Sequence, residues 1–243
     1  MHAVAQQEYH TVSRTSWGIS LLGWLLCSLL AIVIYQWVER PDLRCWEGTK
    51  THGSPAVRAV ALTFDDGPHP LWAPLLADTL ERHDARGTFF LVGVEAQRYP
   101  EMTARLVRAG HQVGSHSMTH PYPNLTALPA LQIAREVRQA SQILQQIVGQ
   151  PVYDFRPPGG GVNDTLISVL KHDGLRMAWW SENVGDWSSP TPEVTAQRLR
   201  HALRPGLVVL MHERENSVAA LERFLAVRGR EDYTYTTFAA VVR

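Results

Sequence analysis

The stretch VRAVALTFDDGP, residues 57–68, is an apolar run that stops at two adjacent aspartates and a Gly-Pro pair. Its β-branched and aromatic residues are typical of a buried strand, and Gly67-Pro68 predicts a turn directly after it. We therefore predict a strand over residues 57–64 whose carboxyl end presents Asp65 and Asp66. Taken alone, DDGP is more often a solvated turn, so its interpretation depends on the rest of the chain.

The remaining sequence alternates short β-rich runs with segments of helical periodicity. Further strands are predicted at residues 88–93, 111–117, 152–158, 176–182, 207–212 and 233–242. Helices are predicted at residues 71–85, 99–109, 130–148, 163–173, 192–203 and 215–228. This alternation indicates an α/β fold with a mainly parallel sheet. About seven strands in roughly 190 residues favour a small or distorted (β/α) barrel over a complete eightfold one.

Polar side chains follow the apolar runs at the points where the runs end. They are Asp65 and Asp66, His116 and His120, Arg156, Asp186 and His212. In a (β/α) barrel, functional residues lie at the carboxyl ends of the strands. Residues placed only for solubility would not collect there, so the pattern predicts a single site at one end of the barrel.

Two histidines four residues apart, His116 and His120, have the spacing that brings two imidazoles onto one helical turn. With Asp66 they predict a metal site of two histidines and one carboxylate, for which Zn²⁺ is the expected ion. An isolated pair of this kind is more often structural, so the assignment depends on its position beside Asp66. The only cysteines, Cys27 and Cys45, exclude a cysteine-rich zinc site.

Other residues in this set are suited to proton transfer. Adjacent residues that leave a strand project in opposite directions, so we expect Asp65 to act as a base beside a metal held by Asp66. Arg156 is suited to orient a carboxylate through a bidentate pair. His212 is suited to act as a general acid if Asp186 holds its second ring nitrogen. Taken singly, Arg156 is equally reasonable as a surface arginine, and a packed histidine is the default interpretation of His212.

The motifs TFDDGP (63–68), HSMTH (116–120), RPPGG (156–160), DW (186–187) and VLMH (209–212) occur in the order found in polysaccharide deacetylases. Over about residues 57–242 the chain resembles this metal-dependent group, carbohydrate esterase family 4. The resemblance implies a distorted (β/α) barrel, and removal of N-acetyl groups from amino sugars of an envelope glycan or oligosaccharide. It implies Asp66, His116 and His120 as ligands of a divalent metal, usually zinc.

The resemblance also implies a role for each remaining residue. Asp65 matches the family's catalytic base and His212 its catalytic acid, while Arg156 and Asp186 match the residues that position the base and tune the acid. The substrate-binding positions are matched by Gly159, whose backbone N–H would hold an oxyanion, and by Trp187 and Leu210.

Two positions depart from the family pattern. Gly159 stands where the family usually has Tyr or Phe, and Asn183 stands where it usually has Asp. Substrate choice is therefore more open than reaction type. The alternatives are an O-acetyl esterase, a deformylase acting on a lipid-linked sugar, and a catalytically inactive, membrane-tethered glycan-binding module. Nucleic-acid binding is not expected, because Lys+Arg and Asp+Glu both number 23.

The amino-terminal part of the chain predicts a membrane anchor. Residues 17–38 form a 22-residue run with no Asp, Glu, Lys or Arg, and a helix of this length spans about 33 Å. We divide the chain into a tail (1–16), a single transmembrane span (17–38), a linker (39–55) and a catalytic domain (56–243).

Two arguments bear on the side of the membrane that holds the catalytic domain. Basic residues are more frequent after the span than before it, which favours a cytoplasmic domain, but large domains translocate largely regardless of charge. We expect the catalytic domain on the periplasmic or extracellular side, with the cytoplasmic side as the alternative.

Overall fold

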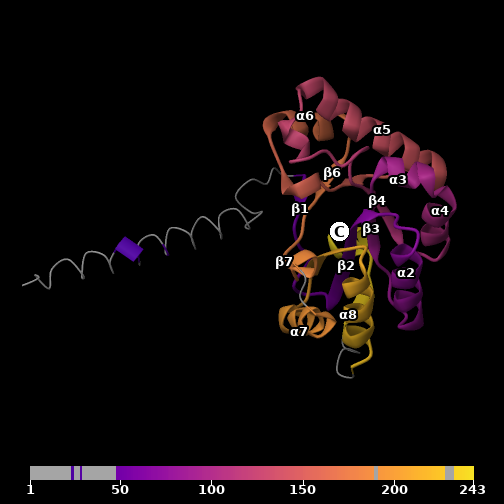
Figure 1. Cartoon of the computed structure of the whole chain (residues 1–243), viewed down its shortest axis with the longest axis vertical. Coiled ribbons are helices and arrows are strands. Elements are labelled where there is room, and N and C mark those ends of the chain that lie inside the picture. Colours follow the sequence, from indigo (N-terminus) through magenta and orange to yellow (C-terminus); the bar gives the residue numbers. More distant parts are fainter. Residues whose placement is uncertain (1–22, 25–27, 29–47, 189–190, 228–232) are drawn as a thin grey trace, which may run out of the picture. The chain divides into compact units, whose positions relative to one another are not determined.

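The computed structural model describes residues 23–24, 28, 48–188, 191–227 and 233–243. From residue 48 onward they form an α/β fold, in which a parallel sheet curls into a half-barrel (Figure 1). Nearly all of the predicted span, 17–38, and all of the predicted tail, 1–16, lie outside the described residues. Among the described residues, no helix has the length and apolar character needed to cross a membrane.

The sheet contains nine strands among the described residues, in the order β1-β6-β5-β4-β3-β2-β8-β7, with β9 beside β2. Their bounds are β1 Thr49–Lys50, β2 Ala59–Gly67, β3 Thr88–Leu91, β4 Gln112–Ser115, β5 Asp154–Phe155, β6 Arg176–Ala178, β7 Glu182–Asn183, β8 Leu207–His212 and β9 Thr234–Thr236. All of these strands pair in parallel. The mainly parallel sheet predicted from the sequence is therefore confirmed.

Three parts of the sheet differ from the sequence prediction. The predicted strand 176–182 is divided into β6 and β7, which pair with different neighbours. Strand β1 lies inside the predicted linker and pairs with β6, so the packed domain begins before residue 56. The predicted strand 233–242 is wrong in its second half, because residues Phe238–Val241 form helix α9. Thr237 caps this helix by accepting a hydrogen bond from the N–H of Ala240, and a side-chain cap of this kind favours helix over strand.

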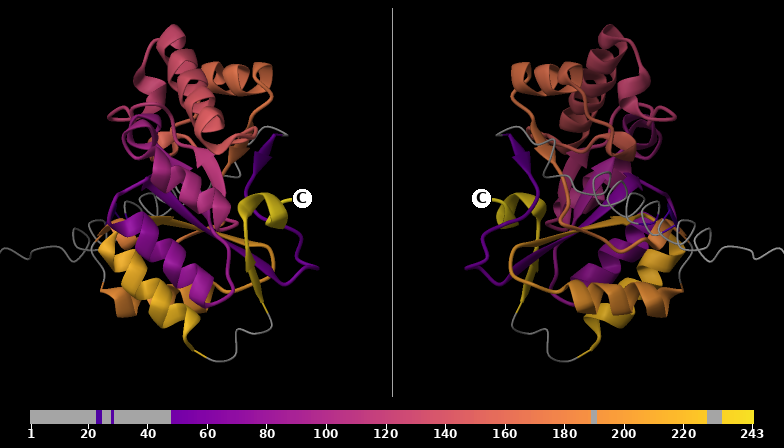
Figure 2. Two further views of the ribbon diagram at one scale, coloured as in Figure 1. Left: turned by 90° about the vertical axis from the view of Figure 1, so that its right-hand side faces the viewer. Right: turned by 90° about the vertical axis from the view of Figure 1, so that its left-hand side faces the viewer.

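The helices lie in two groups around the sheet. Their bounds are α2 Trp72–Arg82, α3 Gly93–Arg98, α4 Pro100–Arg108, α5 Ala130–Val148, α6 Asp164–His172, α7 Pro192–Ala202 and α8 Glu215–Leu225. Figures 1 and 2 show α2, α7 and α8 side by side, while α3, α4, α5 and α6 cover another part of the sheet. The six predicted helices are all present, whereas α3 and α9 were not expected.

Strand β2 shows how the fold positions a site. Its outward residues, Val60, Leu62 and Phe64, are buried in the core formed with helices α2 and α8. Its alternate residues Ala59 and Ala61 pack inside the half-barrel. Because side chains alternate along a strand, the next positions on this inner face are polar, Thr63 and then Asp65. The apolar interior thus ends in a polar site at the carboxyl end of β2.

The opposite end of the half-barrel is closed by polar contacts to α9. Phe238 N–H donates to Thr88 Oγ1 at 2.7 Å, and Ala239 N–H donates to Gln112 Oε1 at 2.9 Å. Gln112 in turn donates to Asp154 Oδ2 at 2.6 Å. Thr88, Gln112 and Asp154 are the first residues of their strands, so this end is filled and the carboxyl ends remain available for chemistry.

His111, just before β4, gives the fold a predicted sensitivity to acid. Its side chain is fully buried, and its Nδ1 accepts a hydrogen bond from Gly87 N–H at 3.2 Å. Burial, with Arg86 and Arg105 nearby, lowers the pKa of His111 from 6.5 to about 4. The unfolded chain therefore binds a proton more readily, and stability is lost as pH falls from 6.5 towards 4.

We expect His111→Gln to remove this loss. The free energy of unfolding of the wild type, relative to that of His111→Gln, should fall by about 3 kcal/mol between pH 7 and pH 4. Urea denaturation of the metal-free proteins measures this difference. His201→Gln, at an exposed position on α7, serves as the matched control. Parallel pH curves for wild type and His111→Gln would contradict the prediction.

Candidate functional site

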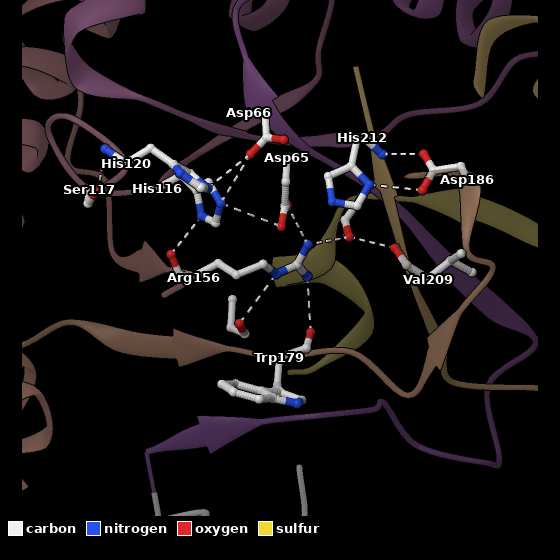
Figure 3. Close-up of polar contacts among 12 residues, drawn as sticks. Asp65, Asp66, His116, Ser117, His120, Arg156, Trp179, Asp186, Val209 and His212 are labelled. Carbon is white, nitrogen blue, oxygen red and sulfur yellow. Dashed lines mark hydrogen bonds and ion pairs between the residues drawn. The ribbon is translucent and has the colours of Figure 1, made fainter. Parts of the chain in front are cut away.

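The structure brings together at one end of the half-barrel the polar residues that the sequence indicated (Figure 3). Asp65 and Asp66 end β2, His116 and His120 follow β4, Arg156 follows β5, Asp186 begins the 3₁₀ turn η4 (Asp186–Ser188), and His212 ends β8. Each residue therefore comes from the carboxyl end of a strand or from the segment that follows it.

The two adjacent aspartates do not project in opposite directions as expected. Asp65 Oδ2 and Asp66 Oδ1 lie 3.8 and 3.5 Å from the same atom, Nε2 of His116. The cause is local, because Asp66 has a φ of 73° and the register with β3 shifts between Phe64 and Gly67. A left-handed residue interrupts the alternation of the strand, so both carboxylates face the site.

The histidine pair does not lie on a helical turn, which corrects the second geometric expectation. Residues 116–120 form a loop in which Ser117 and His120 have φ values of 66° and 52°. Ser117 Oγ accepts a hydrogen bond from His120 N–H at 3.1 Å. The four-residue spacing therefore brings the imidazoles together through a tight loop.

Glu136 of helix α5 anchors this loop, although Glu136 was not among the residues predicted from the sequence. Its Oε2 accepts from the N–H groups of Met118 and Thr119 at 2.9 and 2.8 Å, and its Oε1 accepts from Thr119 Oγ1 at 2.8 Å. Met118 and Thr119 lie between the two histidines, and Glu136 lies sixteen residues beyond His120. No short-range pattern connects these residues.

The donor set of Asp66, His116 and His120 fits a divalent metal. One ligand atom from each residue lies within 4.8 Å of the other two. His116 Nδ1 donates to the carbonyl oxygen of Arg156 at 2.8 Å, so Nε2 is the ring nitrogen that faces Asp66 and is the one able to bind a metal. His120 Nε2 lies 3.3 Å from Asp66 Oδ1. Two imidazoles and a carboxylate suit Zn²⁺.

Asp66 is held in the ionised form that a metal ligand requires. Burial alone would raise the pKa of Asp66. The neighbouring His116, together with His212 and His120, outweighs burial and moves this pKa well below its usual range. The carboxylate is therefore charged over the whole physiological pH range.

Arg156 is fully buried beneath the site and holds Asp65. Its Nη1 donates to Asp65 Oδ1 and to Thr63 Oγ1, both at 2.7 Å. The remaining donors reach backbone carbonyls: Nη2 contacts Trp179 O at 3.1 Å and Nε contacts Ala178 O at 3.4 Å. The expected bidentate pair is thus replaced by a single bond, because carbonyl groups occupy the other donors. Asp65 keeps Oδ2 facing His116 (Figure 3).

His212 is oriented by Asp186 on the other side of Asp65 (Figure 3). Asp186 Oδ1 lies 2.8 Å from His212 Nδ1, and Oδ2 accepts from the backbone N–H of His212 at 2.7 Å and from Ser217 Oγ at 2.6 Å. Burial lowers the pKa of His212, but the hydrogen bond and charge of Asp186 outweigh it, so the net pKa is raised. Nε2 remains available to a substrate.

A second carboxyl group that was not among the predicted site residues, Glu213, lies buried next to Gly67. Its Oε2 accepts from the backbone N–H of His69 at 2.6 Å. Burial is the main cause that raises the pKa of Glu213 to about 8, with Asp66 and Asp65 adding to the effect and the His69 N–H opposing it. A side chain at position 67 would collide with Glu213, which explains the glycine there.

The three predicted substrate-binding residues lie around this site. Leu210 is buried on β8, two residues before His212 and on the same face of the strand. Trp187 is 54% exposed on η4. Gly159, in the 3₁₀ turn η3 (Pro158–Gly160), has a φ of 61°. The departure at Asn183 has a structural use, because its Oδ1 accepts from Gly185 N–H at 2.9 Å in the turn that leads to Asp186.

A curled parallel sheet with an Asp/His/His cluster beside a buried carboxylate defines an α/β half-barrel with a candidate three-ligand metal site. The family model for polysaccharide deacetylase matches residues 52–178. A peptidoglycan-N-acetylglucosamine deacetylase of Bacillus cereus is 30% identical over 192 residues, 76% of this chain and 89% of the relative. A chitooligosaccharide deacetylase of Sinorhizobium fredii is 32% identical over 182 residues, 69% of this chain and 84% of the relative.

The crystal structure of a carbohydrate esterase family 4 pseudoenzyme from Bacillus anthracis matches with a TM-score of 0.74 and 25% identity, over 80% of this chain and 69% of that one. The chain belongs to the polysaccharide deacetylase family, carbohydrate esterase family 4. Its membership agrees with the resemblance inferred from the five motifs.

The role of Glu136 as an anchor of the His120 loop predicts a defect in metal binding. We expect Glu136→Ala to weaken Zn²⁺ binding about 10- to 100-fold, because partners that orient a ligand affect affinity by this amount. Competition with a chromogenic chelator measures the dissociation constant. Glu101→Ala, at an exposed position of α4, is the control. Equal affinities for the two variants would show that the loop holds His120 without Glu136.

Proposed function

We propose that this protein is a metal-dependent hydrolase that removes N-acetyl groups from amino sugars of a cell-envelope glycan or oligosaccharide. The observation that carries the proposal is the position of Asp65. This carboxylate is held by Arg156, faces the metal-site residue His116 at 3.8 Å, and is accompanied by an oriented histidine, His212. A base, a metal site and an acid therefore converge on one small region.

A divalent ion, which we propose to be Zn²⁺, held by Asp66, His116 and His120 would supply a Lewis acid that polarises an acyl oxygen and lowers the pKa of water. Asp65 accepts a proton as water attacks the amide carbonyl. Arg156 keeps that carboxylate aimed into the site. The backbone N–H of Gly159 is proposed to donate to the developing oxyanion.

His212 completes the reaction by donating a proton from Nε2 to the leaving amine. An amine leaves poorly unless it is protonated, so hydrolysis needs a dedicated acid. Asp186 fixes the ring through Nδ1 and stabilises the protonated form. Leu210 and Trp187 are proposed to line the acetyl-binding region. The products are a free amino sugar and acetate.

The substrate class is inferred from the relatives. Their names specify peptidoglycan and chitooligosaccharides, both N-acetylated glycans. An O-acetyl esterase and a deformylase acting on a lipid-linked sugar would use the same site. The Bacillus anthracis pseudoenzyme makes an inactive glycan-binding module a second alternative. The presence of the metal donor set together with Asp65 and His212 favours an active enzyme.

We further propose that residues 17–38 anchor the chain in a membrane, with the catalytic domain on the periplasmic or extracellular side. The support is the uncharged 22-residue run in the sequence. Envelope glycans lie on that side, so this location is consistent with the proposed substrate.

The activity is tested by acetate release from N-acetylglucosamine oligomers and from peptidoglycan. We expect release that stops with a chelator and returns with Zn²⁺. Asp65→Asn and His212→Ala should each lower kcat at least about 100-fold, because each removes a proton-transfer group. Bound Zn²⁺ and circular dichroism spectra should match those of the wild type. Near-normal rates in both variants would refute the assigned roles.

The Asp186–His212 contact predicts a change in the pH profile. Asp186 raises the pKa of His212, so Asp186→Asn should lower that pKa. Because the acid must be protonated to act, the alkaline limb of the kcat profile should move to lower pH. Asp173→Asn, in the segment before β6 at the other end of the half-barrel, is the control. An unmoved alkaline limb in Asp186→Asn would exclude His212 as the group that titrates there.

A further inference from the structure

Tyr122 is unusual among the described aromatic residues because the residue is 95% exposed. It lies two residues after the metal-site residue His120, between Pro121 and Pro123. A single exposed aromatic residue needs no explanation in general. Its place beside a metal ligand, in a segment whose backbone is restricted by two prolines, distinguishes it from a random surface tyrosine.

The loop that carries Tyr122 is packed against the loop that carries Gly159. A Cβ atom placed at Gly159 would lie 3.5 Å from Pro123 O and 3.7 Å from Asn124 Cβ. Asn124 Oδ1 also accepts from the N–H of Ala127 at 3.1 Å, which begins the 3₁₀ turn η2 (Leu125–Ala127). The segment directly after Tyr122 therefore packs against the Gly159 loop, and Tyr122 lies on the chain between His120 and that contact.

A second exposed aromatic residue is attached to the segment that carries Asp186. Trp187 is 54% exposed and directly follows Asp186, the partner of His212. Figure 3 shows His120 and Asp186 on opposite sides of Asp65 and Asp66. Tyr122 and Trp187 follow His120 and Asp186 closely in the sequence, so the backbone carries an exposed aromatic residue near each of these two positions.

We propose that Tyr122 forms a glycan subsite, in which its ring stacks on the sugar next to the one that is deacetylated. The apolar C–H face of a pyranose and an aromatic ring bury each other from water, and a tyrosine with only two side-chain torsions loses little entropy on binding. This inference rests on the proposed function. It adds that the enzyme binds a second sugar of the chain, through a contact outside the acetyl group that is removed.

The subsite predicts a dependence on chain length. With one acetylated sugar in the site, the pentamer of N-acetylglucosamine can place a neighbouring sugar against Tyr122 in more of its binding positions than the dimer can. For the zinc-loaded full chain in detergent, Tyr122→Ala should lower kcat/KM for the pentamer about tenfold, a typical value for one aromatic contact. The loss should appear in KM rather than kcat and should be smaller for the dimer. Tyr122→Trp should restore most of the pentamer rate.

Tyr153→Ala is the matched control, because Tyr153 is 55% exposed and directly precedes β5, at the other end of the half-barrel. It should match the wild type on both oligomers. If Tyr122→Ala also behaves as Tyr153→Ala does on both oligomers, the subsite is refuted. An equal loss on dimer and pentamer, or a loss in kcat alone, would also refute it, because damage to the metal loop gives this result.

Failure of the proposed function is separated from failure of the subsite by binding of the pentamer, measured by titration calorimetry. If the wild type releases no acetate but binds the pentamer, and Tyr122→Ala binds it about tenfold more weakly than Tyr153→Ala, the subsite stands and the deacetylase proposal fails. If the wild type does not bind the pentamer, or if both variants bind it equally, the subsite is refuted.

Discussion

The buried pair of Arg156 and Asp65 is the interaction on which the remainder of the site depends. A guanidinium with no exposed surface is costly, and removing one partner of such a pair typically costs about 3–5 kcal/mol. Here the cost is offset by Thr63, by two backbone carbonyls, and by the face of Phe90, whose ring centroid lies 4.0 Å from the guanidinium carbon. The backbone carbonyl of Arg156 also fixes the tautomer of His116, so one residue positions both Asp65 and His116.

Charge is distributed unevenly across this small region. Asp66 is held ionised by histidines, while burial raises the pKa of Glu213 to about 8, so Glu213 carries a proton at neutral pH. A third negative charge beside Asp65 and Asp66 would be repelled by both, and the neutral carboxyl avoids that cost while still accepting the N–H of His69. Negative charge is thus concentrated at the candidate metal site, while the buried carboxyl group beside Gly67 is neutral.

The positions of the main strands along the chain, and the set of residues at their carboxyl ends, could be predicted from the sequence. Apolar runs and the polar residues after them are local signals. The sequence was insufficient where geometry depends on distant partners. The left-handed φ of Asp66 interrupts the alternation of side chains along β2. The His120 loop is anchored by Glu136, on helix α5. Helix Phe238–Val241 forms where its first two N–H groups donate to Thr88 and Gln112. The structure in these cases is decided either by a contact with a residue far away in the sequence or by a single backbone torsion angle. Neither leaves a local pattern in the sequence.

The two departures from the family pattern have different structural consequences. Asn183 keeps a defined turn before Asp186, so this side of the site is supported in spite of the substitution. Gly159 has a left-handed φ of 61°, a conformation in which a Tyr or Phe would be strained, and the space beyond its Cα is bordered by the Tyr122 loop instead of by a side chain of its own. An aromatic wall that the family pattern places within the third motif is absent here. The loop that borders this space carries the exposed Tyr122 and also His120, so a sugar contact at Tyr122, as proposed, would be coupled to the placement of His120 through one short segment.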